Sequence, residues 1–127
     1  MTEQLDQLAA AKYLLLTTFR KDGTAVPTPI WFARDGEDLV VWTPTGSGKV
    51  KRVRRDGAVT AAACDFRGTQ SGDAFPAHAR LLDAAGTARV RALISKRYGW
   101  FAWLTVQGSK LRRGLSGTVG IAITLDA

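Results

Sequence analysis

Apolar residues follow two different spacings along the chain, and the two spacings predict strands alternating with a few short helices. Leu5 and Leu8 lie three positions apart among good helix formers, so residues 3–11 are predicted to form an amphipathic helix that covers one end of the fold. A longer helix is predicted for residues 87–98, where apolar side chains recur at helical spacing. Strands are predicted for residues 13–19, 25–33, 38–42, 59–65, 76–83 and 119–125.

The turn residues between these segments favour antiparallel neighbours. Gly23 and Gly36 stand where tight hairpins need a positive φ. Pro27 and Pro29 remove backbone donors from the second predicted strand, which places that strand at an edge or a bulge. We therefore predict one mainly β (α+β) domain over residues 1–127, a small antiparallel barrel with helices packed outside it.

One further segment is strongly basic and predicts a short helix with an anion site at its start. Ser47 is a candidate N-cap, Val50 and Val53 share one face, and Gly57 is a candidate stop. A helix start offers free N–H groups and a positive dipole end, which suit a phosphate. The candidate phosphate ligands are Thr43, Ser47, Gly48, Lys49 and Lys51, whereas Arg52 and Arg55 are predicted to lie on a solvated surface.

One alternative to an anion site stays open for this segment. The whole basic helix can be a solvated charged face, because runs of charge are often surface decoration. A Walker A loop is not among the candidates, since the Gly-x-x-x-x-Gly-Lys-Ser/Thr order is missing from the sequence.

The composition argues against several kinds of metal and catalytic site. The single cysteine, Cys64, cannot form an internal disulfide or a cysteine-based zinc site, so no metal is predicted, and we expect this thiol to be buried. His78 is the only histidine and is predicted to be structural rather than a general base. No apolar run is long enough to span a bilayer, and residues 1–6 lack the pattern of a signal peptide, which predicts a cytoplasmic protein.

The charge balance indicates an anionic partner. The chain has 18 Lys and Arg against 11 Asp and Glu, a formal net charge of +7. Nucleic acid, anionic lipid and a phosphorylated small molecule would each suit a basic surface. Aromatic residues are not interleaved with the basic run and no nucleic-acid-binding motif is present, so a small molecule is predicted, with no nucleic acid and no membrane as partners.

Several segments in order resemble one known family, the pyridoxamine 5′-phosphate oxidase-like split β-barrel proteins, and within it the small oxidoreductases that use the deazaflavin coenzyme F420. The similarity lies in residues 12–23, 26–32, 35–39, 41–43, 48–55 and 79–82 and extends over nearly the whole chain. It implies a split β-barrel of the FMN-binding type and a homodimer with the cofactor site at the subunit interface.

The resemblance also implies roles for particular residues. Val26, Thr28 and Pro29 would meet the flavin-like ring, Trp42 and Thr43 would flank it, and Ser47, Gly48, Lys49 and Lys51 would bind the phosphate. The aromatic residues Trp100, Phe101 and Trp103 and the basic segment 110–113 would come from the partner chain.

The function implied by the resemblance is hydride transfer from reduced F420 to an electron-poor small molecule. The cofactor itself performs such chemistry, so no catalytic side chain is assigned. The polyanionic tail of F420 suits the basic surplus better than FMN does. Two alternatives remain, an FMN-binding oxidoreductase of the same fold and an F420-binding carrier protein without turnover.

Overall fold

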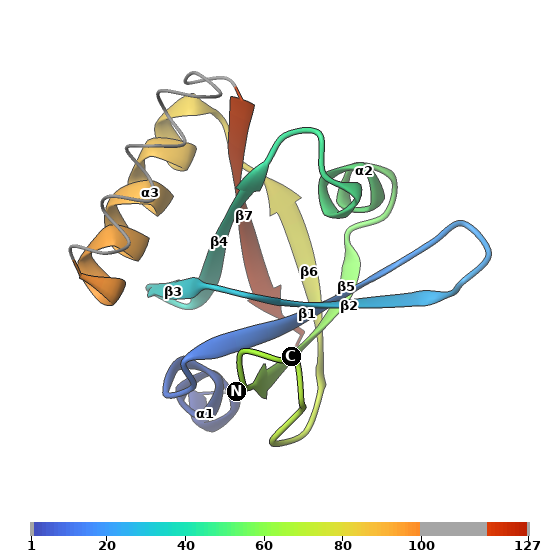
Figure 1. The fold of residues 1–127 in the computed structure, drawn as a ribbon, viewed down its shortest axis with the longest axis horizontal. Helices are drawn as coiled ribbons and strands as arrows, with labels where there is room; N and C mark the ends of the chain where they lie inside the picture. Colours follow the sequence, from blue (N-terminus) through green and yellow to red (C-terminus); the bar gives the residue numbers. More distant parts are fainter. Residues whose placement is uncertain (1, 100–116, 127) are drawn as a thin grey trace.

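Three helices and seven strands make up the described part of the chain (Figure 1). The structure, a computed structural model, describes residues 2–99 and 117–126. Its elements are α1 (Thr2–Ala9), β1 (Tyr13–Phe19), β2 (Ala25–Ile30), β3 (Phe32–Asp35), β4 (Asp38–Pro44), α2 (Gly48–Arg55), β5 (Ala58–Cys64), β6 (Phe75–Leu81), α3 (Ala84–Tyr98) and β7 (Thr118–Leu125). Trp100, Phe101, Trp103 and the basic segment 110–113 lie outside the described residues.

All strand pairs are antiparallel, and the strand order is β2-β1-β5-β6-β7-β4-β3. The two ends of this order, β2 and β3, follow one another in the chain with only Trp31 between them. One segment therefore pairs with β1 through its first half and with β4 through its second half, which curls the sheet into a split barrel. The predicted fold class is confirmed, as is the terminal position of the proline-containing strand β2.

The second predicted strand was wrong in one respect, because residues 25–33 do not form a single strand. The chain breaks at Trp31, where the Tyr98 ring from the end of α3 stacks on the indole at 4.8 Å. The Tyr98 hydroxyl accepts a hydrogen bond from the Phe32 N–H at 3.2 Å. The Tyr98 side chain, 66 residues away in sequence, thus provides a hydrogen-bond partner for the Phe32 N–H at the strand break.

Three apolar clusters are found among the described residues: one inside the barrel, one between the sheet and α3, and a small one of Leu15, Ala62 and Cys64. The inner cluster includes Leu14, Leu16, Phe32, Leu39, Val41, Ile121 and Ile123, together with Leu5 and Leu8 from α1. The outer cluster joins Val90 and Ile94 of α3 to Ala33, Val40 and Ala122 of the sheet. Because both leucines of α1 are buried in the inner cluster, the covering role predicted for this helix is confirmed.

Several predicted boundaries are corrected by a few residues. The first helix ends at Ala9 rather than residue 11, and α3 begins at Ala84 rather than residue 87. Asp83 caps α3, since its carboxylate accepts the Gly86 N–H at 2.8 Å. Gly23 and Gly36 do adopt positive φ, as predicted.

The helix α2 ends just before Gly57, as predicted, but this glycine does not end it through a positive φ. Asp56 is the C-cap of that helix, and Gly57 is not among the glycines with positive φ. A Cβ on residue 57 would lie 2.7 Å from the Ala79 carbonyl oxygen of β6. The glycine is needed because another backbone approaches it, and not because of the helix end.

Candidate anion site at the start of helix α2

The loop after β4 turns into α2 through a set of local hydrogen bonds. The Ser47 N–H donates to the Pro44 carbonyl at 3.1 Å, and the Ser47 hydroxyl accepts the Val50 N–H at 3.4 Å, which confirms the predicted N-cap. The buried Thr43 hydroxyl donates to Ser47 Oγ at 3.3 Å. Val50 and Val53 are buried, so the helix is held with a fixed orientation against the barrel.

Two cations of α2 lie together on one flank of the helix. Residues 49 and 52 are three apart, a spacing that places their side chains side by side. Burial lowers the pKa of Lys49 below its usual value, and the positive charge of Arg52 lowers this pKa further. The Arg52 guanidinium also folds back over the first turn, because a Cβ on Gly48 would stand 2.7 Å from Arg52 Nη1. The glycine at position 48 leaves room for this guanidinium.

A threonine of β1 fixes the direction of Arg52. Arg52 Nε donates to Thr18 Oγ1 at 2.6 Å, and Thr18 is only 1% exposed. This bond uses one donor of the guanidinium and leaves its two terminal nitrogens beside Gly48. The prediction that Arg52 lies on a solvated surface was wrong, since its side chain is partly buried and bonded to Thr18. Arg55 is exposed, as predicted, and its Nη2 donates to the Phe19 carbonyl of β1 at 2.5 Å.

No carboxylate neutralises this pair of cations within residues 2–99 and 117–126. The ion pairs of that part of the chain join Arg34 to Asp6, His78 to Asp126, Arg80 to Asp38 and Arg89 to Asp35. None of them includes a residue of α2, whose first turn contains no acidic side chain. A partly buried cation pair without an anion is costly in an apolar setting, so the start of α2 favours an anionic ligand.

Lys51 does not lie beside Lys49. Two residues apart on a helix means a rotation of about 200°, so the two side chains leave opposite flanks of the helix. Lys51 and Arg54 are exposed, whereas Lys49 and Arg52 are partly buried. The structure therefore brings Lys49, Ser47, Gly48 and Thr43 together and adds Arg52 and Thr18, which sequence reasoning missed.

The predicted ring-contacting residues of β2 divide between its two faces. Val26 is directly opposite Thr18, and Thr28 is directly opposite the buried Leu16. Directly opposed residues of an antiparallel pair share a face, so Val26 and Thr28 lie on the face that carries Thr18 and its bond to Arg52. Pro29 points to the other face, where its ring lies close to Gly68.

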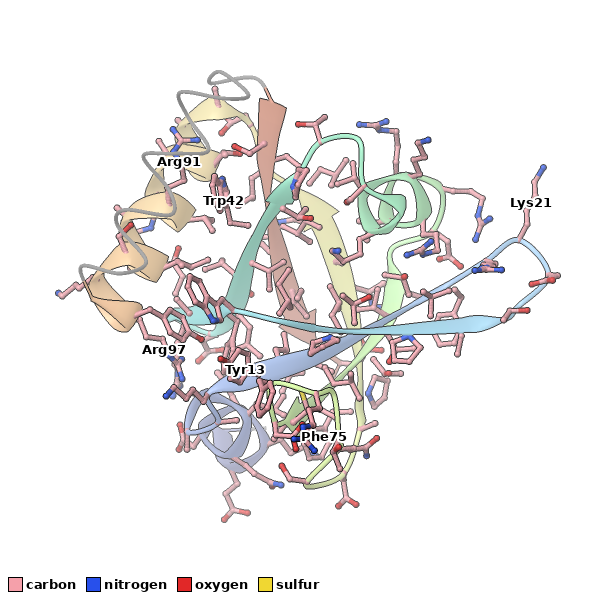
Figure 2. All side chains as sticks on the ribbon, viewed as in Figure 1. Tyr13, Lys21, Trp42, Phe75, Arg91 and Arg97 are labelled. Atoms are coloured by element: carbon pink, nitrogen blue, oxygen red, sulfur yellow. The ribbon has the colours of Figure 1, made fainter. Side chains whose placement is uncertain are left out.

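Trp42 is a neighbour of Thr43 in sequence but lies on the opposite face of β4. It packs against the outer cluster between the sheet and α3 (Figure 2). Its indole Nε1 donates to Thr118 Oγ1 at 2.9 Å. The contacts of Pro29, Trp42 and Lys51 with a cofactor stay predictions, but these three residues do not join the group around Arg52.

Cys64 in β5 and His78 in β6 do not belong to the group around Arg52. Cys64 is buried, as predicted, and burial raises the pKa of its thiol. His78 is exposed and its Nδ1 lies 2.7 Å from a carboxylate oxygen of Asp126. Among the described residues there is no cluster of three or more His, Cys, Asp or Glu suited to a metal ion. No helix in that same part is long and apolar enough to cross a membrane.

Comparison with known structures agrees with the split-barrel fold. The conserved hypothetical protein Rv2991 from Mycobacterium tuberculosis superposes with a TM-score of 0.74 at 21% identity, over 99% of this chain and 80% of that one. An F420 reductase superposes with a TM-score of 0.62 at 20% identity, over 96% and 92% of the two chains. A FAD-binding protein from Mesorhizobium loti gives 0.66 at 15% identity, over 99% and 87%.

At such identities the likeness concerns the fold, and these proteins differ in the cofactors that their names record. No curated protein matches the sequence. The family model for pyridoxamine 5′-phosphate oxidase matches residues 1–126. The chain therefore belongs to the pyridoxamine 5′-phosphate oxidase family.

Proposed function

We propose that this protein is an oxidoreductase that binds the deazaflavin coenzyme F420 and reduces an electron-poor small molecule. The observation that carries the proposal is the pair of partly buried cations, Lys49 and Arg52, beside the open start of α2. Membership of the family and the shared fold of an F420 reductase support the choice of a flavin-like cofactor.

The residues at this site suit the phosphate of such a cofactor. Lys49 and Arg52 supply two positive charges, and the free N–H groups of the first turn of α2 add donors. Thr18 holds Arg52 in place, so little side-chain freedom is lost on binding. When bound, the coenzyme would supply a hydride to the acceptor, with the accompanying proton taken from solvent.

F420 is preferred over FMN because α2 carries further cations that would not contact the phosphate. Lys51 and Arg54 are exposed on the other flank of α2, and neither takes part in any of the ion pairs found in residues 2–99 and 117–126. The tail of F420 continues beyond its phosphate into glutamates, and these carboxylates would be attracted to the exposed pair. FMN carries no charge beyond its phosphate and remains the second candidate.

Fluorescence titration of the purified protein with F420 and with FMN tests this proposal. Replacing Lys49 or Arg52 with glutamine should weaken binding of either cofactor about tenfold or more, because each change removes a charge-assisted bond to phosphate. Lys51→Gln should weaken F420 binding more than FMN binding. Lys21→Gln, at the exposed tip of the β1–β2 hairpin, is the control and should leave both affinities unchanged (Figure 2).

The possible outcomes separate the candidate functions. Binding of FMN without F420 would make the protein a flavin enzyme. Tight F420 binding without reduction of a panel of enones and quinones would identify a carrier. Equal affinities of the wild type and the Lys49 and Arg52 variants would show that α2 is only a charged surface.

A further inference from the structure

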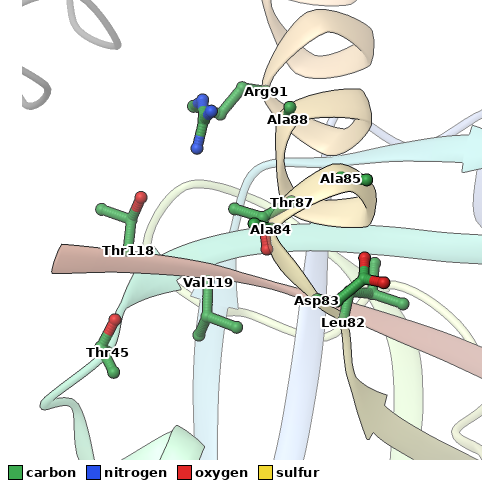
Figure 3. A pocket seen from close by; sticks show the side chains of 10 residues that line it. All are labelled: Thr45, Leu82, Asp83, Ala84, Ala85, Thr87, Ala88, Arg91, Thr118 and Val119. Carbon is green, nitrogen blue, oxygen red and sulfur yellow. The ribbon is translucent and has the colours of Figure 1, made fainter. Parts of the chain in front are cut away.

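A second candidate site lies on the outer side of the sheet, between the start of α3 and the start of β7 (Figure 3). It is a pocket of about 530 Å³ that also reaches Thr45 in the loop after β4. Pockets that bind small molecules have volumes of roughly 300–1,000 Å³. No residue of the anion site lines it, so its occupancy does not depend on the function proposed above.

The pocket exists because α3 approaches β7 closely at one point and presents small side chains beside it. A Cβ on Gly120 would lie 2.9 Å from Val90 Cγ2, and the Gly120 N–H donates to Thr87 Oγ1 at 2.9 Å. Ala84, Thr87, Ala88 and Arg91 share one face of the helix, since they follow the i, i+3, i+4, i+7 spacing. The alanines on this face are too small to fill the space in front of them.

Arg91 is the cationic residue among the described residues that line the pocket. Its guanidinium extends from α3 toward the side where Thr118 begins β7 (Figure 3). The side chain is partly buried and has no hydrogen-bond or ion-pair partner in the part of the chain that the structure describes. Arg89, two residues earlier in the same helix, donates two bonds of 2.8 Å to the carboxylate of Asp35. Within the described residues, Arg91 is thus a positive charge that no anion neutralises.

The other polar groups of the pocket are already held in place by the protein. Thr118 Oγ1 accepts the Trp42 Nε1–H at 2.9 Å, which leaves its own hydroxyl hydrogen to donate. Asp83, the only acidic residue among the described residues of the lining, lies well apart from Arg91 in Figure 3 and caps α3 through the Gly86 N–H. Leu82 and Val119 give the wall between them an apolar character.

We propose that this pocket binds a small carboxylate with a compact apolar body. The carboxylate would pair with Arg91, whose planar fork of donors matches two carboxylate oxygens. The apolar body would lie against Leu82, Val119 and the alanines of α3. The Thr118 hydroxyl is placed to donate a further hydrogen bond to the ligand.

Titration calorimetry with benzoate tests the proposal, with benzamide as the neutral compound of the same shape, both at constant ionic strength. The wild type should bind benzoate at one site. Its affinity for benzamide should be lower by about tenfold or more, because only benzoate pairs with the arginine. The Arg91→Gln variant should have an affinity for benzoate that is lower than that of the wild type by a similar factor. Ala88→Leu should also lose it, since the larger side chain fills the pocket from an exposed helix position that tolerates leucine.

Lys96→Gln is the matched control, because it removes one positive charge from an exposed position of α3 that does not line the pocket. Its affinity for benzoate should equal that of the wild type, and circular dichroism should show all three variants folded. The proposal is overturned if the wild type shows no saturable benzoate binding, if benzamide binds as well as benzoate, or if Arg91→Gln keeps the wild-type affinity. Binding of F420 or FMN does not enter this test, so either proposal can fail alone.

Discussion

Tyr98 joins three parts of the chain through one side chain. Its hydroxyl lies 2.7 Å from the Lys12 carbonyl oxygen and 3.0 Å from the Phe32 carbonyl oxygen, and it accepts the Phe32 N–H. Its ring stacks on Trp31, and Arg97 lies 4.3 Å above the centre of the Phe32 ring. Burial raises the pKa of the Tyr98 phenol, so the neutral hydroxyl is kept as a donor. This group of contacts fixes the break between β2 and β3.

Replacing Tyr98 with phenylalanine should destabilise the protein by about 1–3 kcal/mol, because the ring contacts remain while the partly buried Phe32 N–H loses its partner. Urea denaturation followed by circular dichroism would measure the change. Tyr13→Phe is the control, since it removes a hydroxyl from a partly buried tyrosine of β1 for which no such bond is found in residues 2–99 and 117–126. A loss below about 0.5 kcal/mol for Tyr98→Phe would show that water replaces the hydroxyl at the break.

Residues whose role is local could be assigned from the sequence, and residues with distant partners could not. Ser47 was identified as an N-cap because its acceptor bond reaches only to Val50. Arg52 was assigned to the surface because its partner, Thr18, is 34 residues away. The sequence did show that Gly48, Lys49 and Arg52 lie on one side of a helix. This spacing indicates a contact with β1 only when it is known which side of α2 faces the barrel.

The junction between α2 and β5 shows how closely two elements can approach when a side chain is absent. Gly57 lies against the backbone of β6, and the Ala79 N–H donates to the Gly57 carbonyl at 2.8 Å. This contact ties the end of α2 to the sheet and so orients the helix whose start carries Lys49 and Arg52.

Gly57→Ala should therefore destabilise the protein by about 1–3 kcal/mol, because the new methyl group would meet a backbone oxygen that cannot move without shifting β6. Gly46→Ala is the matched control, since no atom lies within 4 Å of a Cβ placed there. Thermal unfolding of both variants measures the difference. Equal melting temperatures would mean that β6 yields without cost.

The barrel as a whole leaves little room for a cofactor inside it. Side chains of the inner cluster, among them Leu16, Phe32, Val41 and Ile121, are fully buried and fill the interior. A ring system bound by a small barrel of this kind would therefore lie on its outside, where a second protomer could cover it.

We expect a homodimer, and sedimentation velocity should give a mass of twice 13.7 kDa. The cofactor should bind only under conditions in which the dimer persists, because the partner is expected to cover the ring. A species of 13.7 kDa that binds the cofactor with full affinity would contradict this expectation.

The approximate positions of most strands, two hairpin turns and the basic helix were determined by the sequence alone, because they follow from side-chain periodicity, from glycine and proline stereochemistry and from capping within a few residues. The tertiary structure decided the break at Trp31, the pairing of Lys49 with Arg52 rather than Lys51, and the pocket beside Arg91. Each of these depends on which face of one element meets another across the barrel, and periodicity along a single segment contains no information on that meeting.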